Sequence, residues 1–443
     1  MLVLNEYNGQ LMTDPECDEF GNILLKFGIP YIVESFYLMV GHCEPDNRYE
    51  MYISVLRQHS IAMLHQVCPI LQACNVSFKV LKNNDLVDQS NGMLHGISTS
   101  GKTLTIFPKS AKDAAWLAQK IEKLTKDFHG QFIKNCQRIG QILYYPLNAP
   151  ALPYTIPKQY RIKRRKGLIG KYYLPIKLIR FNPKGDIMMG VNFRKMAITP
   201  CLIKQARANA YEDLNGRKPF HRLIWQKSVI ENLGNTIPVP GIIDLCIQDE
   251  DYYLITEFIE GPSLSEMVRT LHQDTKWGDL KIPVKIDLLH LFRQAVLIVE
   301  KIHAAGYIHR DIQINNFLIN RGKLYIIDFE LSYNFIDHLP RPAYSLGTKG
   351  FVSPEQTEGK LPQTGEDIFS LGAVLAYMII NPVHRKEFSD NIYDDLLACG
   401  IENKLLALIS GCLQENPINR PNIPAIKDAL TTIISNINDK GKS

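Results

Sequence analysis

The chain has 443 residues, of which 45% are hydrophobic and 21% charged, and its formal net charge is +5. This composition allows two or three folded domains, and it argues against a disordered chain and against a nucleic-acid-binding protein. No stretch approaches about 18 consecutive apolar residues, and the first residues lack the pattern of a secretion signal, so we expect no membrane span. The nine cysteines show no zinc-ligand spacing, which favours reduced thiols in a cytoplasmic protein.

An α+β pattern fills residues 1–150, which we expect to form a separate small domain. Short runs of β-branched and aromatic residues predict strands, and an apolar segment predicts a helix between the first two. The predicted elements are the strands 50–57, 76–82 and 103–108 and the helix 61–74. A second helix should begin after Ser110, because Asp113 follows it at the spacing of a helix N-cap.

Prolines followed by basic residues mark 151–171, which we interpret as a solvated linker. After it the chain shows short strands and then, from about residue 284, mostly helices. A strand-rich lobe before a larger helical lobe is the order of a protein kinase, so we expect the two lobes at 172–262 and 263–443. The predicted fold class is α+β, with a bilobal kinase-like domain after the small α+β domain.

The segment YIHRDIQINNFLI contains residue types that phosphoryl transfer requires. His309, Arg310 and Asp311 are consecutive, and Asn316 follows in the same segment. In a kinase, the aspartate accepts the proton of the attacking hydroxyl and the asparagine holds Mg²⁺. Asp328 ends the apolar run LYII, where its carboxylate can hold the Mg²⁺ that accompanies ATP.

Three later motifs follow in the order of a kinase C-lobe. Glu355 ends Ser-Pro-Glu, which resembles the Ala-Pro-Glu that closes an activation segment. Asp367 begins DIFSLG and is the expected anchor of the catalytic loop. Arg420, in CLQENPINRP, is expected to pair with Glu355. Together with the catalytic loop, these motifs predict an ATP- and Mg²⁺-dependent protein kinase.

The motifs of the nucleotide-binding lobe are less regular. Lys204, in PCLIKQAR, is the candidate for the lysine that contacts the α- and β-phosphates. LITEFIEG resembles the hinge of a kinase, where Thr256 is expected beside the adenine pocket. The backbone from Glu257 to Ile259 is expected to bind adenine.

Two further positions in this lobe depart from the usual kinase pattern. Gly185 is the candidate glycine of the phosphate-covering loop, although FNPKGDIMMGVN lacks a full Gly-x-Gly-x-x-Gly. Gln226 occupies the position where a helix should offer an acid to Lys204, and Glu231 is the alternative acid. A glutamine can hydrogen-bond an ammonium group, a contact of about 1.5–3 kcal/mol, but it brings no charge.

Two features resemble the class III lanthipeptide synthetases. The first is IIDFE, in which Glu330 replaces the glycine of Asp-Phe-Gly. The second is the first domain, where YEMYISVLRQHSIAMLHQVCPILQACNVSFKVLKN and GKTLTIFPKSAKDAAWLAQKIEKL resemble that family's lyase domain, itself similar to phosphothreonine lyases. In that family the kinase phosphorylates Ser and Thr of a precursor peptide, the lyase eliminates the phosphate, and a cyclase adds Cys thiols.

The resemblance implies roles for residues of the first domain. Lys79 matches the proposed base of the lyase, and Lys102 and Arg138 match its phosphate-binding positions. Glu50 and Tyr52 stand where the family has a lysine and a histidine, so we expect elimination to be impaired. The sequence ends near the end of the kinase motifs, so we expect no cyclase domain and a stand-alone cyclase as a partner.

Several functions are compatible with these observations. The leading hypothesis is a Ser/Thr protein kinase that acts on a peptide or protein substrate, such as a lanthipeptide precursor, behind a lyase-like domain. A first alternative is a bifunctional kinase and phospho-Ser/Thr lyase, which would be a dehydratase. A second is a pseudokinase scaffold that binds a precursor or a partner enzyme. A third is a regulatory kinase whose first domain only binds partners.

Overall fold

The structure, a computed structural model, describes residues 19–42, 48–92, 95–96, 98–161, 167–194, 198–208, 210, 212–213, 215–344, 347–381 and 392–440. The chain divides into two compact units. The first unit is Met1–Thr199 with Ile203–Phe220 and Cys246–Tyr253, and the second is Pro200–Leu202, His221–Leu245 and Leu254–Ser443.

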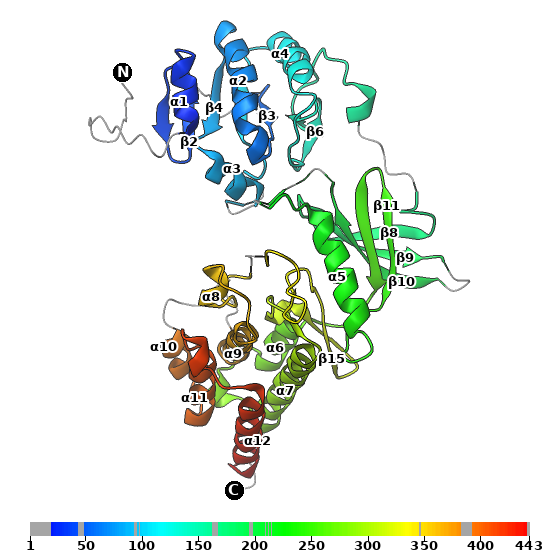
Figure 1. Cartoon of the computed structure of the whole chain (residues 1–443), viewed down its shortest axis with the longest axis vertical. Coiled ribbons are helices and arrows are strands. Elements are labelled where there is room, and N and C mark those ends of the chain that lie inside the picture. The colour runs from blue at the N-terminus through cyan, green and yellow to red at the C-terminus, as the bar shows by residue number, and fades with distance from the viewer. Residues whose placement is uncertain are drawn as a thin grey trace, which may run out of the picture. The chain divides into compact units, whose positions relative to one another are not determined.

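A seven-stranded antiparallel sheet forms the centre of the N-terminal domain (Figure 1), with the strand order β1-β2-β4-β5-β3-β7-β6. Its strands are β1 (Ile32–Glu34), β2 (Tyr37–Val40), β3 (Met51–Ile53), β4 (Ser77–Leu81), β5 (Leu104–Phe107), β6 (Cys136–Arg138) and β7 (Leu143–Pro146). All three strands that the sequence predicts are present, and each is shorter than predicted. The α+β class of this domain is therefore confirmed.

Helices bury the apolar face of this sheet. They are α1 (Glu19–Lys26), α2 (Arg57–Ala73), α3 (Asn84–Asn91) and α4 (Ala111–Leu124). Helix α2 packs against the other three, and Figure 1 shows α1, α2 and α4 following one another across the domain. Helix α4 begins where predicted, because Ser110 Oγ accepts a hydrogen bond of 3.1 Å from the Asp113 N–H. Apolar residues of helices and strands form one core, which includes Met51, Ile53, Phe78, Val80, Leu104, Met63, Leu64, Val67, Leu117 and Ile121.

A second sheet has five strands in the order β11-β12-β10-β9-β8. They are β8 (Tyr173–Arg180), β9 (Ile187–Asn192), β10 (Thr199–Ala206), β11 (Ile242–Gln248) and β12 (Asp251–Glu257). The hairpin β8–β9 belongs to the first unit. Phe181, directly after β8, lies against Phe132 of the N-terminal domain with ring centroids 6.2 Å apart, and the Arg207 guanidinium lies 5.1 Å above the Phe132 ring. These contacts join Phe181 and Arg207 to the N-terminal domain within the first unit.

The second unit is mainly helical and holds the catalytic motifs. Its helices are α5 (Pro219–Leu233, whose first two residues belong to the first unit), α6 (Leu264–His272), α7 (Ile282–Ala304), α8 (Pro354–Thr357), α9 (Gly365–Ile380), α10 (Ile392–Ala398), α11 (Asn403–Cys412) and α12 (Ile423–Lys440). Helix α9 is buried along most of its length and packs against α7, α10 and α11, as its continuous apolar sequence requires. It is the central helix of this unit.

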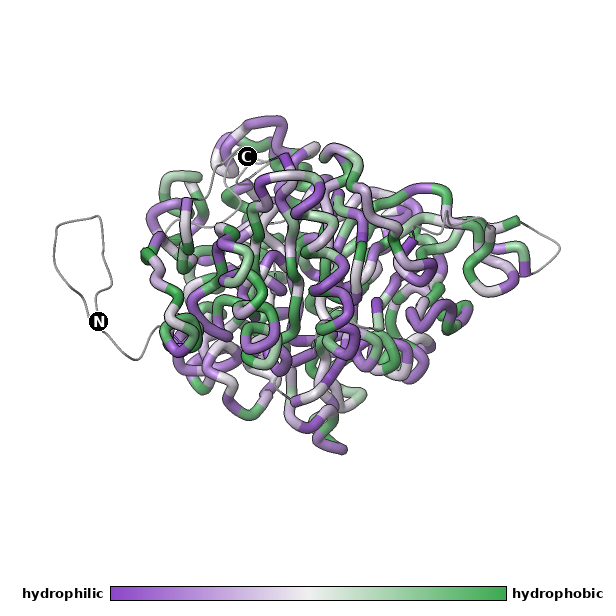
Figure 2. Tube along the Cα trace, turned by 90° about the horizontal axis from the view of Figure 1, so that it is seen from above, coloured by the Kyte–Doolittle hydropathy of each residue, from purple (hydrophilic) through white to green (hydrophobic). Residues whose placement is uncertain are grey.

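Short strands and turns connect the helices of the second unit. Two antiparallel pairs form here, β13 (Tyr307–Ile308) with β16 (Tyr333–Asn334) and β14 (Phe317–Asn320) with β15 (Lys323–Ile326). The described 3₁₀ turns of the chain are η1 (Lys158–Tyr160), η2 (Trp277–Asp279), η3 (Ile314–Asn316) and η4 (Pro417–Asn419). Among the described residues, no helix has both the length and the apolar character that crossing a membrane requires. In Figure 2, hydrophobic and hydrophilic residues are mixed along the trace.

Candidate active site

Two strand pairs hold the loop that carries Asp311. Strand β13 ends at Ile308, directly before His309, and the loop leads through η3 into β14. Two non-glycine residues near the loop have a left-handed backbone, Arg310 with φ 65° and Asp328 with φ 69°. Such conformations cost energy and persist where the surrounding contacts impose them, which makes them frequent at functional sites.

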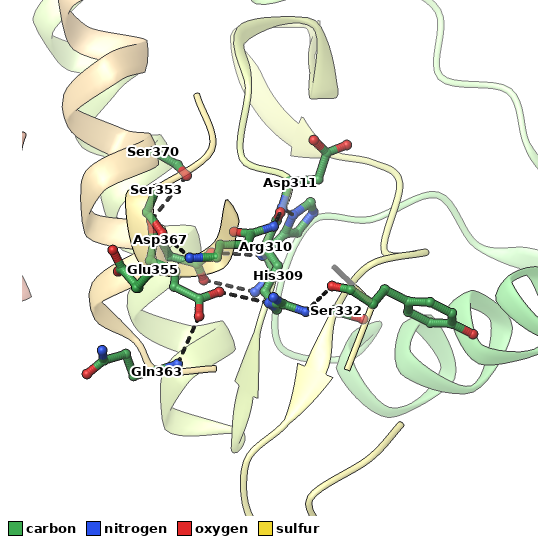
Figure 3. Close-up of polar contacts among 12 residues, drawn as sticks. His309, Arg310, Asp311, Ser332, Ser353, Glu355, Gln363, Asp367 and Ser370 are labelled. Carbon is green, nitrogen blue, oxygen red and sulfur yellow. Dashed lines mark hydrogen bonds and ion pairs between the residues drawn. The ribbon is translucent and has the colours of Figure 1, made fainter. Parts of the chain in front are cut away.

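Asp367, at the start of α9, anchors this loop (Figure 3). Its carboxylate is fully buried and accepts hydrogen bonds of 2.9 Å from the backbone N–H groups of His309 and Arg310. A third contact, 2.8 Å long, joins it to Nε2 of His303. Burial acts to raise the pKa of Asp367, but the hydrogen bond and charge of His303 bring the pKa below its usual value. The anchor is therefore ionised at neutral pH.

Arg310 is held by a partner that the sequence analysis did not identify. Its Nε donates a 2.8 Å hydrogen bond to Oε2 of Glu366, and both side chains are almost completely buried. Its Nη1 donates to the Tyr344 carbonyl over 2.6 Å, and its own carbonyl accepts from Nε2 of Gln356 over 2.8 Å. The sequence carries no local signal for this ion pair, because Glu366 lies 56 residues from Arg310 in the chain.

Asp311 lies in a set of hydrogen bonds that orient both of its oxygens. Oδ1 accepts from Thr348 Oγ1 over 2.7 Å, and Oδ2 accepts from Asn316 Nδ2 over 3.0 Å. Asn316 Nδ2 also donates to the Asp311 carbonyl over 2.8 Å. Burial raises the pKa of Asp311 to about 7, although the hydrogen bond from Thr348 opposes the shift. A carboxylate with this pKa is suited to accept a proton near neutral pH.

Asp328 is brought next to the catalytic loop by the backbone. The N–H of Ile327 donates to the Asn316 carbonyl over 2.9 Å. The following residue, Phe329, is fully buried with its ring centroid 4.6 Å from that of His309. Glu330 is not among the residues with positive φ, so its backbone does not need the glycine that kinases have at this position.

The predicted ion pair between Glu355 and Arg420 is present. Two parallel contacts of 2.5 and 2.9 Å join the guanidinium to the carboxylate, and both side chains are buried. Burial acts to raise the pKa of Glu355, but the hydrogen bonds and charge of Arg420 lower it overall. Bidentate geometry makes this one of the stronger kinds of ion pair, and it fastens α8 to the residues before α12.

Gly185 has a structural reason to be glycine. Its φ is 153°, and a Cβ at this position would lie 1.7 Å from the Gln205 carbonyl oxygen on β10. Hydrogen bonds from Gln205 N to Asp186 O (2.9 Å) and from Arg207 N to Lys184 O (2.8 Å) hold the loop there. The close approach of two backbones therefore explains this glycine without any phosphate.

The candidate lysine and its expected partner lie on different elements. Lys204 is on β10 in the first unit, and Gln226 is a buried residue of α5 in the second. The alternative acid, Glu231, forms an ion pair of 2.7 Å with Lys227 on the same helix. A pairing of Lys204 with Gln226 stays a prediction, whereas the carboxylate of Glu231 already has a cation beside it.

The hinge-like segment follows β12. Thr256 is buried, and its hydroxyl makes a long 3.4 Å contact with the Glu257 carbonyl. The backbone N–H of Glu257 donates to the Gly241 carbonyl over 2.8 Å, so this donor is already in use. The backbone groups that the segment can offer to adenine are therefore the Glu257 carbonyl and the groups up to the buried Ile259.

The lyase-like residues lie together on the sheet of the N-terminal domain. Lys79, Thr105, Tyr52, Tyr144 and Arg138 are directly opposite one another on neighbouring strands. Residues in such a row point to the same face of a sheet. Lys102 joins the row, because its Nζ lies 3.9 Å above the Tyr52 ring.

Several polar groups of this row already have partners within the chain. The Tyr52 hydroxyl donates a hydrogen bond to Oε1 of Glu50, and burial together with this carboxylate raises the pKa of Tyr52. Burial lowers the pKa of Lys102. The Arg138 side chain donates to the carbonyls of Gly140 and Gln141, so its N–H groups hold a turn of the chain. A phosphate would have to compete with these contacts.

Comparisons with known proteins match both parts of the chain. Residues 39–146 match the RamC N-terminal domain, and residues 227–430 match the protein kinase domain. The probable serine/threonine-protein kinase CPE1738 of Clostridium perfringens (strain 13 / Type A) is 26% identical over 221 residues, which are 46% of this chain and 30% of that protein. Serine/threonine-protein kinase C of Synechocystis is 27% identical over 219 residues, 46% of this chain and 38% of its own length. The probable serine/threonine-protein kinase YbdM of Bacillus subtilis is 25% identical over 211 residues, 48% of this chain and 71% of its own length.

The chain thus spans about a third of the length of the first two curated relatives. The protein kinase domain is homologous to Ser/Thr protein kinases. A region that matches the RamC N-terminal domain therefore precedes a region that matches the protein kinase domain, and this order matches the RamC-like class III lanthipeptide synthetases.

Proposed function

We propose that this chain is an ATP- and Mg²⁺-dependent Ser/Thr kinase that phosphorylates a peptide in lanthipeptide-type precursor modification. The observation that carries the proposal is the double orientation of Asp311 by Thr348 and Asn316, on a loop anchored by Asp367. A scaffold without catalysis has no need for a carboxylate held in this way. The RamC N-terminal domain supports a precursor peptide as the substrate.

The residues present fit Mg²⁺ and ATP. Asn316 uses its amide N–H groups on Asp311, so its amide oxygen is the atom that it can offer to a cation. Asp328 adds a carboxylate, and Mg²⁺ prefers oxygen ligands and is usually bound by one or two carboxylates together with substrate phosphates.

The proposed chemistry assigns separate tasks to the residues around Asp311. MgATP supplies the phosphoryl group when it is bound. The substrate hydroxyl would displace or join Thr348 at Asp311 Oδ1, and Asp311 would receive the hydroxyl proton. The γ-phosphoryl group would pass to the hydroxyl oxygen, its bond to the bridging oxygen would break, and ADP would leave. Asn316 holds Oδ2 so that Oδ1 faces the substrate. Asp367 keeps the loop in place through the backbone of His309 and Arg310.

For the N-terminal domain we propose binding of a phosphopeptide without efficient elimination. Lys79 and Lys102 can attract a phosphate, which a strand face with two lysines favours. Tyr52 is bound to Glu50 and has a raised pKa, so it is poorly suited to protonate a leaving phosphate. A bifunctional kinase and lyase is the second candidate, because the register of the sheet gathers Lys79 and Tyr52 into one row.

The experiment that tests the proposal uses the full chain with Mg²⁺ and ATP labelled on its γ-phosphate. The acceptors are the chain itself and a peptide rich in Ser, Thr and Cys. Label on Ser or Thr of either acceptor supports the kinase. Absence of label, together with measurable ATP binding, favours the pseudokinase scaffold instead.

A further inference from the structure

Arg222 and Glu330 form an ion pair that none of the roles above uses. Arg222 lies in the first turns of α5, and its Nη1 is 3.7 Å from Oε1 of Glu330. The Arg222 side chain is 10% exposed and that of Glu330 is 35% exposed, so the pair is partly shielded from water. Glu330 stands two residues after Asp328, where the usual kinase glycine has no side chain that could make this contact.

Arg222 also contacts the far end of the segment that Glu330 begins. Its guanidinium carbon lies 5.1 Å above the ring of Tyr344, which is buried. Stacking of a guanidinium on an aromatic face is attractive, and more so away from water. The Tyr344 carbonyl accepts the 2.6 Å hydrogen bond from Arg310, the residue directly before Asp311. One arginine therefore touches both ends of residues 330–344.

A second residue of α5 fastens the start of this segment. Trp225 Nε1 donates to the Ser332 carbonyl over 2.8 Å. Ser332 Oγ in turn donates to the Phe329 carbonyl over 2.7 Å, which closes the turn directly after Asp328. Arg222 and Trp225 are three residues apart and so lie on neighbouring positions of one helix face. This face of α5 binds the turn that follows Asp328.

We propose that Arg222 is a positioning residue of the kinase, which uses Glu330 and Tyr344 to hold the Asp328 turn against α5. In other kinases a charged lysine–acid pair fixes this helix, but here the expected position carries the uncharged Gln226. The Arg222–Glu330 pair supplies a charged contact on the same helix, one turn earlier. The inference deepens the proposed kinase function and rests on it for its catalytic consequence.

The test is a charge-swap cycle in the full chain. Arg222→Glu and Glu330→Arg each place like charges opposite one another, and we expect each to lower kcat by about tenfold with little change in KM for the peptide. The double variant Arg222→Glu with Glu330→Arg restores opposite charges, so we expect kcat within about threefold of the original. Arg222→Lys keeps the charge but loses the planar stack on Tyr344, so we expect an intermediate kcat.

Lys227→Ala is the matched control, because Lys227 also forms an ion pair on α5 but with its helical neighbour Glu231. We expect it to keep kcat within about twofold, since exposed pairs of this kind contribute little. If kcat of the double variant were as low as the two single effects combined predict, the proposal would be overturned. A loss of kcat in Lys227→Ala as large as in the Arg222 and Glu330 variants would also overturn it. Melting temperatures of all variants identify any variant that fails to fold. If a charge-swap variant fails to fold, the kcat of Arg222→Lys decides the test.

A second readout does not need catalysis. Amide hydrogen exchange of residues 329–334 should speed up in each single variant and slow again in the double variant, because the ion pair holds this turn. If the unaltered chain transfers no phosphate, the proposed kinase function fails while this exchange pattern still decides the role of Arg222. Unchanged exchange in all variants refutes the positioning role even in an active kinase.

Discussion

Thr348 donates a 2.7 Å hydrogen bond from its hydroxyl to Oδ1 of Asp311, so the candidate base is already bound to a hydroxyl of its own chain. The second oxygen of Asp311 is held by Asn316. Thr348 therefore lies where an attacking Ser or Thr hydroxyl would approach the base. This contact gives the proposed kinase a preorganised base, and it leads to the first prediction.

Thr348→Val should lower kcat by about 10- to 100-fold, because a hydrogen bond to a charged group contributes about 1.5–3 kcal/mol and valine keeps the shape but not the hydroxyl. Thr348→Ser keeps the hydroxyl and should stay within about threefold of the original. The measurement is phosphate transfer to a Ser- and Thr-containing peptide at saturating ATP. Equal activity of the valine and serine variants would show that the hydrogen bond does not position Asp311.

Glu355→Gln should destabilise the second unit at pH 7.5 by about 3–5 kcal/mol, because it leaves the buried Arg420 without its counter-charge. The pKa of Glu355 is lower in the folded protein than its ordinary value of 4.5. The unfolded chain thus binds more protons, and the stabilisation is fully present above about pH 4.5 and is lost as the pH falls through the lower folded pKa. Urea unfolding of the original chain and of Glu355→Gln at several pH values measures this stabilisation.

The difference between the original chain and Glu355→Gln should therefore shrink between pH 4.5 and the strongly acidic range. Lys360→Ala is a suitable control, since Lys360 pairs with Glu358 in an exposed contact nearby. It should change stability far less than Glu355→Gln does, because exposed ion pairs contribute little. A Glu355→Gln effect that stays constant with pH would contradict the ionised state assigned to this carboxylate.

Gly185→Ala should lower the melting temperature without any nucleotide present. The new Cβ would meet the Gln205 carbonyl oxygen at 1.7 Å, and the positive φ adds strain for any side chain. Gly167→Ala is the matched control, because Gly167 also has a positive φ but a Cβ there meets no atom within 4 Å. If Gly185→Ala affects only the affinity for ATP and leaves stability unchanged, the glycine serves phosphate binding instead of packing.

A peptide treated with the chain and MgATP should accumulate phosphate and not lose water. Tyr52, bound to Glu50 and with a raised pKa, is a poor acid, and Glu50 repels a phosphate at this face. Mass spectrometry distinguishes a gain of one phosphate per site from a net loss of one water per site. Dehydrated peptide from the original chain would refute this prediction.

The double variant Glu50→Lys with Tyr52→His tests why we expect elimination to be impaired. It restores the residue types that the lyase family has at these positions, so we expect some dehydrated product from a phosphopeptide supplied directly. Glu50→Lys alone should improve phosphopeptide binding more than elimination, because it removes a negative charge but supplies no acid. Neither variant should change phosphate transfer by the kinase part.

The sequence motifs predicted the elements and pairs that depend on local spacing. The N-cap Ser110, the strands around Tyr52 and Lys79 and the ion pair of Glu355 with Arg420 all follow from patterns within short segments or from a known motif order. A buried charge needs a partner, but the partner can come from any part of the chain. Contacts between distant residues were therefore harder to predict. Glu366 as partner of Arg310 lies 56 residues away in the chain, and nothing in the local pattern names it.

In the first domain, too, local sequence patterns predicted some contacts and missed others. A one-residue register decides which side chains share a sheet face, and the register of β3, β4 and β5 places Tyr52 and Lys79 in one row. The sequence pointed to Glu50 and Tyr52 as the altered positions of the lyase site, and the two side chains are joined by a hydrogen bond. It did not predict that Arg138 turns to the carbonyls of Gly140 and Gln141, since such contacts depend on a loop conformation.

Phosphate transfer by the full chain, compared with Asp311→Asn and Asp328→Ala, tests the central claim most directly. With Mg²⁺ and γ-labelled ATP, the unaltered chain should label Ser or Thr of itself or of a peptide. Asp311→Asn should lower turnover by about 10²–10⁴-fold, the usual contribution of a general base, and Asp328→Ala should abolish Mg²⁺-dependent transfer while the chain stays folded by circular dichroism. If both variants transferred phosphate as fast as the unaltered chain, this result would contradict the assignment of this site as a kinase active site.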